Sequence, residues 1–189
     1  MVVARILEQW EPLRLFFEAE SPTDKVDGAA NIFRVMVTPG TKHTLYSLNY
    51  VLPKINIMNR QFQSEGFRIH KVYKSIRATY REILSLFICD EVIHTHDLTT
   101  IDPTCKRNHR PIMEVHLGGG CYAEMQRAPV GDNQTHLRED CLKFLVELCV
   151  QTCKCFDMKT WNISYITSHP FFTGSLELTN DQLPTSVAS

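Results

Sequence analysis

The feature that most constrains the fold is a hydrophobic repeat with helical spacing in residues 69–87. Its eight apolar positions are Ile69, Val72, Tyr73, Ile76, Tyr80, Ile83, Leu84 and Phe87. Because an α-helix turns by about 100° per residue, all of these positions fall within one arc of roughly 120°. The repeat therefore predicts a long helix that buries this arc against the rest of the protein.

The opposite arc of the same helix is basic. It carries Arg68, Lys71, Lys74, Arg77 and Arg81. A nearby loop segment, "CKRNHR", adds Lys106, Arg107 and Arg110. A row of cations can meet the phosphates of a nucleic acid, although a solvated face that happens to be basic is the simpler interpretation. These side chains are the candidate nucleic-acid-binding residues of the chain.

Three further helices follow from the same spacing rule. Residues 41–64 carry a stripe of Leu45, Leu48, Leu52, Ile55, Asn59 and Phe62. Pro53 lies within this stripe and predicts a kink, and Gly66 is placed to cap the end of the helix. A helix over Ile6–Phe17 is expected to kink or restart at Pro12.

The last expected helix spans residues 133–156, with Asp132 or Asn133 as its N-terminal cap. One face would present Leu137, Cys141, Phe144, Leu145, Leu148, Thr152 and Cys155. Residues 21–40 are expected to form a loop containing one short helix. Periodicity disappears over residues 89–132, where we expect loops with a short strand or turn around Val115–Tyr122, and "HLGGGC" is interpreted as a flexible turn.

The expected fold class is therefore mainly α, an irregular bundle of about four to five helices with a long loop region. Residues 1–156 form the expected helical domain, and residues 157–189 form a divergent tail whose polar end is expected to be disordered. A chain of 189 residues with 43% hydrophobic content can bury a core of this size.

Charge, cysteine content and apolar runs indicate the environment and the kinds of partner that the chain can have. The formal net charge of −1 means that the whole-chain field neither attracts nor repels nucleic acid, so any such affinity must be local. Seven scattered cysteines are an odd number and indicate reduced thiols. Arg5 and Glu8 interrupt any signal-peptide core, and no apolar run reaches the ~18 to 20 residues of a membrane span. We expect an intracellular, soluble protein with no membrane partner.

The sequence contains no recognisable catalytic, metal-binding or phosphate-binding motif. A group of His94, His96, Asp97, Cys105 and His109 supplies zinc-binding atoms, but without the spacing of a known zinc site. "HLGGGC" lacks the lysine of a phosphate-binding loop, and no nucleophile elbow is present. Asp102, which precedes Pro103, is interpreted as a turn residue. We expect no catalytic residue, no metal, no cofactor and no small-molecule ligand.

Four separated segments resemble the hAT superfamily of DNA transposases and the host proteins derived from them, in the same order. They are "RILEQWEPLRLFF" (5–17), "LNYVLPKINIMNRQFQSEGFRIHKVYKSIRATYREILSLFI" (48–88), "LTTIDP" (98–103) and "HLREDCLKFLVELCVQTCKCF" (136–156). The resemblance covers about residues 5–156. In that family an RNase H-like sheet carries three metal-binding acids, and a large helical insertion separates the second acid from the third. This chain resembles part of that insertion.

The resemblance implies a chain without catalytic activity, because no position here matches any of the three acids. It also implies a nuclear location. The leading hypothesis is a transposase-derived structural or protein-interaction module, in which a surface once packed on the missing sheet invites a protein partner or self-association. The alternative is weak, sequence-nonspecific DNA binding through the basic face of residues 68–88.

Overall fold

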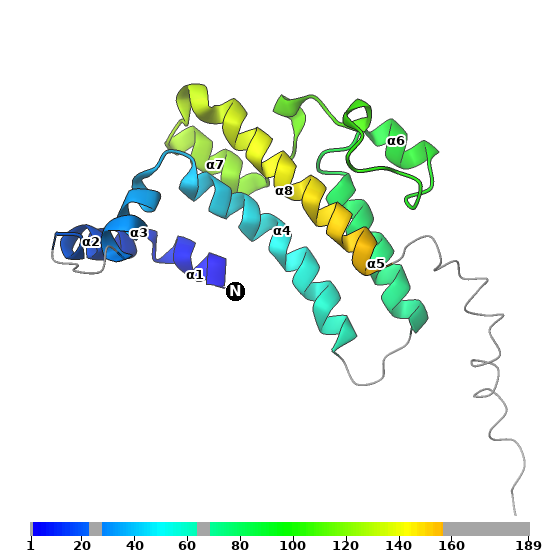
Figure 1. Ribbon diagram of the computed structural model, residues 1–189, viewed down its shortest axis with the longest axis horizontal. Coiled ribbons are helices and arrows are strands. Elements are labelled where there is room, and N and C mark those ends of the chain that lie inside the picture. Colours follow the sequence, from blue (N-terminus) through cyan, green and yellow to red (C-terminus); the bar gives the residue numbers. More distant parts are fainter. Residues whose placement is uncertain (1, 23–27, 64–68, 157–189) are drawn as a thin grey trace, which may run out of the picture.

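The computed structural model describes residues 2–22, 28–63 and 69–156, and this part of the chain is helical (Figure 1). Its α-helices are α1 (Val2–Glu8), α2 (Trp10–Glu20), α3 (Gly28–Val37), α4 (Thr41–Phe62), α5 (Ile69–Leu84), α6 (Asp90–Thr95), α7 (Gly119–Arg127) and α8 (Gln134–Cys155). Short 3₁₀ helices are η1 (Lys106–Asn108), η2 (Ile112–Glu114) and η3 (Gly131–Asn133). The predicted mainly α class is confirmed. The four predicted helical regions are present, and α3 is the short helix expected within residues 21–40. Helices α6 and α7 lie within residues 89–132, where we expected loops.

The chain bends at Gln9, between α1 and α2, one turn before the proline that was expected to cause the bend. Proline has no N–H, and its ring clashes with the carbonyl four residues earlier, which is that of Glu8. The helical path is therefore interrupted just after Glu8. Pro12 itself lies in the first turn of α2, where a missing donor costs little.

Helix α4 runs without interruption through Pro53 and begins after Gly40, whose φ of 95° favours glycine. Its deeply buried residues are His43, Ser47, Val51 and Met58. Leu45, Leu48, Leu52 and Ile55 of the predicted stripe are only half-buried, and Asn59 is exposed. The prediction missed the deepest row because two of its members are polar. His43 fits there since its Nε2 lies 3.0 Å from the carbonyl oxygen of Ala128.

The predicted apolar arc of α5 forms the centre of the core. Tyr73, Ile76, Tyr80, Ile83 and Leu84 of α5 are buried, and so is Phe87, three residues beyond the end of the helix. Helices α4 and α8 pack against α5, and Figure 1 shows α5 beside the end of α8. The Cys153 thiol of α8 donates to the hydroxyl of Tyr80 at 3.1 Å. Burial raises the pKa of Tyr80 well above its ordinary value, so this hydroxyl remains a neutral core group.

The segment after α5 is ordered by backbone pairing and not by a helical repeat. Cys89 N donates to Asn108 O at 2.9 Å, and Arg110 N donates to Phe87 O at 2.8 Å. Among the described residues the only bridge outside helices is the antiparallel pair Ile88 and His109. Asp102 is the predicted turn residue, since its Oδ1 accepts from both N and Oγ1 of Thr104.

The "HLGGGC" segment is not the flexible turn that we expected, nor do Val115–Tyr122 form a strand. Helix α7 begins at Gly119, inside the glycine run, and packs against α4. Gly118 has a φ of +86°, and a Cβ there would lie 2.5 Å from the ring of Tyr50. A Cβ at Gly120 would lie 2.9 Å from the ring of Tyr46. Two of the three glycines therefore let α7 approach the tyrosines of α4.

Helix α8 begins close to the predicted position, with Asn133 in the cap position but without a side-chain cap bond. Its buried residues are Leu137, Arg138, Cys141, Leu145 and Cys149, whereas the predicted Phe144 and Cys155 are exposed. Arg138 is 3% exposed. Its Nη1 donates to the carbonyl oxygen of Val115 at 3.1 Å, and its guanidinium lies over the ring of Tyr122. No carboxylate of the described residues pairs with it.

Two predictions concern residues that the structure does not describe. The cap at Gly66 falls in the gap between α4 and α5, and the divergent tail begins beyond Phe156. Both stay predictions.

Replacing the close-packed glycines should destabilise the fold. Gly118→Ala combines a strained φ with a clash against Tyr50, so we expect a loss of at least about 2 kcal/mol of unfolding free energy, and Gly120→Ala about 1 kcal/mol. Gly119→Ala is the matched control, because its Cβ would meet nothing within 4 Å. It should change stability by no more than about 0.5 kcal/mol. Urea unfolding of the three variants measures the difference, and equal stability of all three would contradict the packing role.

Candidate interaction groove

Helices α1, α2 and α3 form an arm at one end of the molecule (Figure 1). Helices α2 and α3 pack mainly on each other, while α1 and α3 contact the start of the bundle through α4. Neither α1 nor α3 has a buried residue, and α2 has only Trp10. Apolar side chains of this arm that a larger core would cover are consequently left at its surface.

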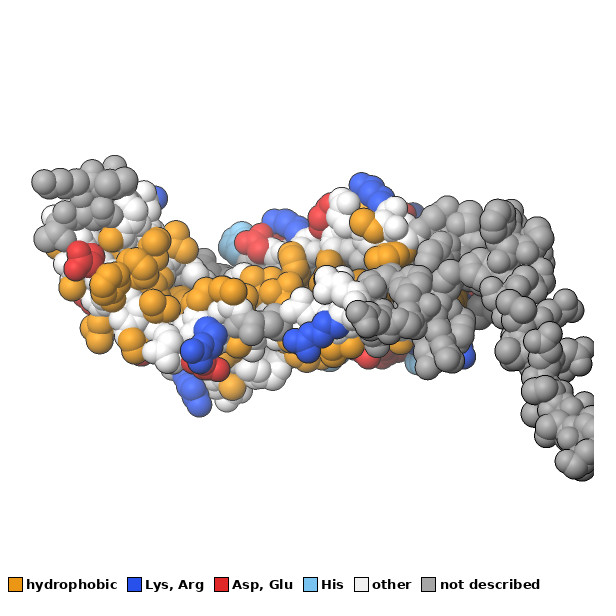
Figure 2. All heavy atoms as spheres, turned by 90° about the horizontal axis from the view of Figure 1, so that it is seen from below, with side chains coloured by type: hydrophobic (Ala, Val, Ile, Leu, Met, Phe, Trp, Pro, Cys, Tyr) orange, Lys and Arg blue, Asp and Glu red, His pale blue; other side chains and the backbone are white. Residues whose placement is uncertain are grey.

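The exposed apolar side chains of the described residues are concentrated on this arm. Of ten large hydrophobic residues that are exposed, six belong to α1–α3: Val2, Leu15, Phe16, Ile32, Val35 and Val37. Figure 2 shows hydrophobic side chains gathered at this end of the molecule. Contiguous exposed apolar surface of this kind marks an interaction site more often than single exposed residues do.

An apolar groove of about 550 Å³ lies between α1, α2, α3 and the start of α4. It is lined by Ile6, Trp10, Leu13, Phe17, Asn31, Ile32, Val35, Met36, Thr41 and Leu45. No charged side chain of the described residues lines it. We call this set of residues the arm groove.

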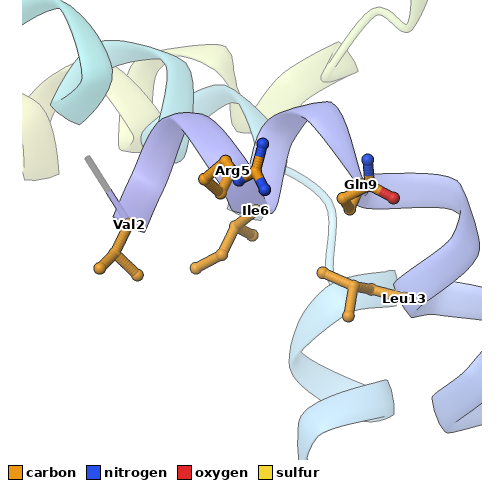
Figure 3. Close-up of a pocket in the computed structure, with 5 residues that line it drawn as sticks. All are labelled: Val2, Arg5, Ile6, Gln9 and Leu13. Carbon is orange, nitrogen blue, oxygen red and sulfur yellow. The ribbon is translucent and has the colours of Figure 1, made fainter.

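A second hollow, of about 570 Å³, adjoins the arm groove along α1 and shares Ile6 and Leu13 with it. Figure 3 shows the five residues that line this hollow: Val2, Ile6 and Leu13 supply its apolar lining, and Arg5 and Gln9 its polar lining. The apolar surface therefore continues from the groove along the length of α1.

Trp10 anchors the arm to the bundle. Its indole is 6% exposed and lies beneath Lys42 of α4, whose Nζ is 5.9 Å from the ring centroid. Lys42 Nζ also pairs with Oε1 of the buried Glu124 of α7 at 2.9 Å. One cation thus connects α2, α4 and α7, and it balances a carboxylate that would be costly to bury alone.

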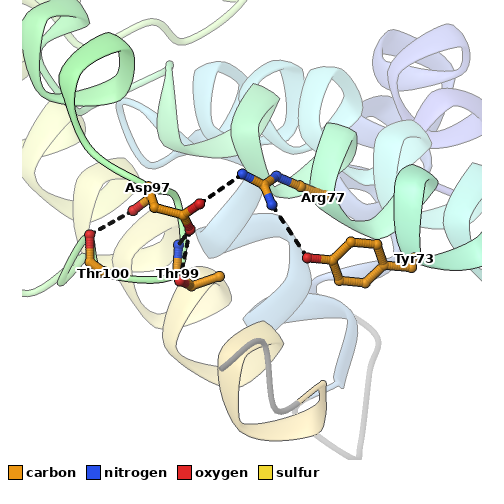
Figure 4. A network of polar contacts seen from close by, with 5 residues as sticks. All are labelled: Tyr73, Arg77, Asp97, Thr99 and Thr100. Carbon is orange, nitrogen blue, oxygen red and sulfur yellow. Dashed lines mark hydrogen bonds and ion pairs between the residues drawn. The ribbon is translucent and has the colours of Figure 1, made fainter. Parts of the chain in front are cut away.

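The basic face of α5 is less free than its sequence suggests. Arg68 lies outside the described residues, and so does the side chain of Lys71. Lys74 is exposed. Arg77 is committed to other groups, because its Nη2 donates to Asp97 at 3.0 Å and its Nη1 donates to the hydroxyl of Tyr73 at 3.3 Å (Figure 4).

The partner of Arg77 is itself fixed in a turn. Oδ1 of Asp97 accepts from the backbone N and the hydroxyl of Thr99, at 2.8 and 2.7 Å. The backbone bond from Thr99 is the main cause that lowers the pKa of Asp97, with the Arg77 bond adding to it. The hydrogen bond to Tyr73 is the main cause that raises the pKa of Arg77. This network joins α5 to the loop after α6 and gives Arg77 a structural role.

The other predicted cations lie at separate places. Arg81 Nη2 is 3.3 Å from Nδ1 of His94, on α6. Arg110 pairs with Asp90 and donates to the carbonyl oxygen of Ile88. Lys106 and Arg107 are exposed on η1. Of the predicted cations whose side chains the structure describes, Lys74 on α5 and Lys106 and Arg107 on η1 are free. These separate cations attract phosphates less strongly than a continuous basic stripe would.

The described residues contain no group of three or more histidine, cysteine or acidic side chains that could hold a metal ion. His109 Nε2 instead lies 2.8 Å from the carbonyl oxygen of Pro103. All seven cysteines are free, and burial raises the pKa of Cys121 to about 12 and that of Cys149 further. Such thiols are core groups and poor nucleophiles.

The arm groove was missed at the sequence level. Residues 21–40 were predicted to contain one short helix, which α3 confirms, but no partner could be assigned to it. Helix α3 supplies one wall of the groove. Whether another element covers that wall depends on tertiary contacts, which a local sequence pattern does not reveal. One sequence signal pointed to the groove. Residues 6–17 and 32–37 are rich in apolar side chains, and the predicted bundle offers few elements to cover them.

Comparison of the chain with protein-family models, curated proteins and solved structures gives no match.

None of the helices in the described ranges combines the length and apolar composition that a bilayer crossing requires.

Acid should weaken the Asp97 network. The pKa of Asp97 is lowered in the fold, so its carboxylate stabilises the native state above the unfolded pKa of about 4, and that contribution is lost as the pH falls through the folded pKa. We expect Asp97→Asn to be less stable than the wild type at pH 6, and we expect this difference to shrink progressively as the pH falls below about 4. Unfolding free energies across this range measure the effect. The exposed Glu114→Gln serves as control, and an Asp97→Asn deficit independent of pH would contradict the network.

Proposed function

We propose that this chain is a non-catalytic protein-interaction module derived from a hAT-type transposase, and that it binds through the arm groove. The single observation that carries the proposal is an uncharged, apolar groove on an arm that holds six exposed large hydrophobic residues. The transposase origin rests on the four sequence segments that resemble that family. The absence of counterparts to the family's three acids supports a role without catalysis.

The shape of the groove supports binding of a helix. One wall is α2, which presents Leu13 and Phe17 four residues apart. A second wall is α3, which presents Ile32 and Val35 three residues apart. An amphipathic helix laid between two such walls can bury side chains at positions i, i+3 and i+4, a common mode of peptide recognition. No charged side chain of the described residues lines the groove, so a partner helix needs no opposite charge to pair with one.

An apolar dye should report on the groove in the folded protein. The chain has two tryptophans, Trp10 and Trp161, so Trp161→Phe leaves the groove tryptophan as the sole indole donor. We expect anilinonaphthalene sulfonate to bind this variant, with its emission sensitised by excitation of Trp10. Adding Ile32→Glu or Val35→Glu should reduce the sensitised emission at least about threefold, because a charge in the groove disfavours apolar ligands.

Ile57→Glu is the matched control for this experiment. Ile57 is exposed to the same extent as the groove residues, but it lies on α4 about 18 Å along the helix from Leu45. It should leave the sensitised emission unchanged. Far-UV circular dichroism confirms that each variant is folded. Equal emission from the groove variants and the control would remove the groove as the binding surface.

The second candidate function is weak, sequence-nonspecific DNA binding. It is favoured by the exposure of Lys74, Lys106 and Arg107. Binding through these separate cations would rest on phosphate contacts alone, so it should weaken as the salt concentration rises. DNA binding through these cations does not involve the arm groove. Substitutions in the groove and substitutions of the three cations therefore test the two functions separately.

Fluorescence anisotropy with a labelled duplex tests this candidate. We expect binding at about 20 mM salt that is lost by about 200 mM. The triple substitution of Lys74, Lys106 and Arg107 by Glu should abolish it, whereas the control pair Lys143→Glu and Lys154→Glu on α8 should not. Failure of the wild type to bind even at the lower salt concentration would eliminate this function.

A further inference from the structure

We propose that residues 90–97 form an autoinhibitory cover at the end of α5, which keeps three arginines from binding the phosphates of a nucleic acid. This segment holds three acids and no lysine or arginine, and we call it the acidic cover. The inference goes beyond the arm groove. It rests on the second candidate function, DNA binding.

The bonded cations of the candidate DNA-binding site share one feature. Six of its cations have described side chains, and three of these have a side-chain partner in the acidic cover. The three pairs are Arg77 with Asp97, Arg81 with His94, and Arg110 with Asp90. A guanidinium group has no acceptor, so the arginine donates in each pair. The cover therefore takes N–H groups that would otherwise be available to phosphates.

The covered arginines lie where they would join the free cations into one surface. Arg77 and Arg81 follow Lys74 along α5 at spacings of three and four residues, so they are neighbours on one side of the helix. Arg110 lies just beyond the end of α5, where its backbone N donates to Phe87 O at 2.8 Å. The same loop carries the free cations of η1. Bonding of the three arginines to the cover thus separates Lys74 from the η1 cations.

Two of these pairs include carboxylates that are open to solvent. The side chain of Arg77 is 40% exposed and that of Asp97 is 49% exposed, while that of Asp90 is 66% exposed. Water screens ion pairs of this kind, so they contribute little to stability and can open. A phosphate that replaced the carboxylate on an arginine would remain beside that carboxylate and be repelled by it. This repulsion is the inhibitory effect of the cover.

The cover is held in place without its ion pairs. Ile93, in the middle of α6, and Leu98, directly after the cover, are both buried in the hydrophobic core that contains the apolar face of α5. Cys89, directly before the cover, donates its backbone N to Asn108 O at 2.9 Å. Neutralising the acids should therefore release the arginines without detaching the segment.

Neutralising the cover should strengthen DNA binding by the full chain. The test variant is Asp90→Asn with Asp97→Asn, and the matched control is Glu91→Gln with Glu114→Gln, which removes the same number of charges. Glu91 and Glu114 are exposed, and neither forms an ion pair with a described residue. Fluorescence anisotropy with a labelled duplex at about 20 mM salt measures the affinities. We expect the test variant to bind at least about fivefold more tightly than the control.

The salt dependence gives a second readout of the same variants. A log–log plot of affinity against salt concentration becomes steeper by about one unit for each phosphate contact. We expect the plot of the test variant to be steeper than that of the control by about one to two units, because two arginines are released. Equal slopes would contradict the release of cations.

A double-mutant cycle assigns the gain to the arginines. Arg77→Gln with Arg110→Gln should remove the gain of the test variant, and the same substitutions should weaken wild-type binding at least about threefold less. An equal effect in both backgrounds would overturn the cover. Circular dichroism verifies that each variant is folded. If the test variant does not fold, Asp97→Asn with Arg77→Gln provides the same cycle for one pair.

The outcomes separate this inference from the DNA-binding function. A wild type that binds, with test and control variants of equal affinity, would overturn the cover and leave the function. A test variant that binds while the wild type and the control do not would support the cover and eliminate DNA binding by the unmodified chain. Absence of binding by all three would overturn both. The arm groove is tested separately by the dye experiment.

Discussion

Burial of the apolar face of α5 is the interaction on which the rest of the structure depends. Helices α4 and α8 both pack against α5, and the segment that follows α5 is held by backbone hydrogen bonds between residues 87–89 and 108–110. Full burial of one large apolar side chain contributes about 1.5–3 kcal/mol. The five buried residues of this face therefore outweigh any single polar contact among the described residues.

The arm of α1–α3 consists of helices that form without such a core. Only Trp10 is buried there, and the Lys42 cation above its ring is shared with Glu124 of α7. The remaining apolar residues line a groove or face solvent. The local sequence still favours helices, but their apolar faces exceed what one small arm can cover. This imbalance underlies the proposal for the arm.

Much of the fold could be predicted because helical spacing is a local property. The α5 face, the extent of α4 through Pro53 and the span of α8 follow from residues within one or a few turns. The candidate site could not be predicted in the same way. The sequence predicts five cations on one arc of the helix at residues 68–88, yet Arg77 is bonded to Asp97, which is twenty positions away in the loop after α6. The groove depends likewise on contacts among α1, α2, α3 and α4.

The sequence alone determined that the described part of the chain is mainly helical, where the apolar face of α5 lies and that proline interrupts the first helix, because backbone sterics and side-chain spacing act over a few residues. Only the tertiary structure decided which polar groups are buried and which apolar groups are exposed. His43 and Arg138 enter the core because backbone carbonyls of Ala128 and Val115 come within reach. Conversely, Phe16 and Val35 stay at the surface, because burial depends on which elements meet, and the described chain supplies no element to cover them.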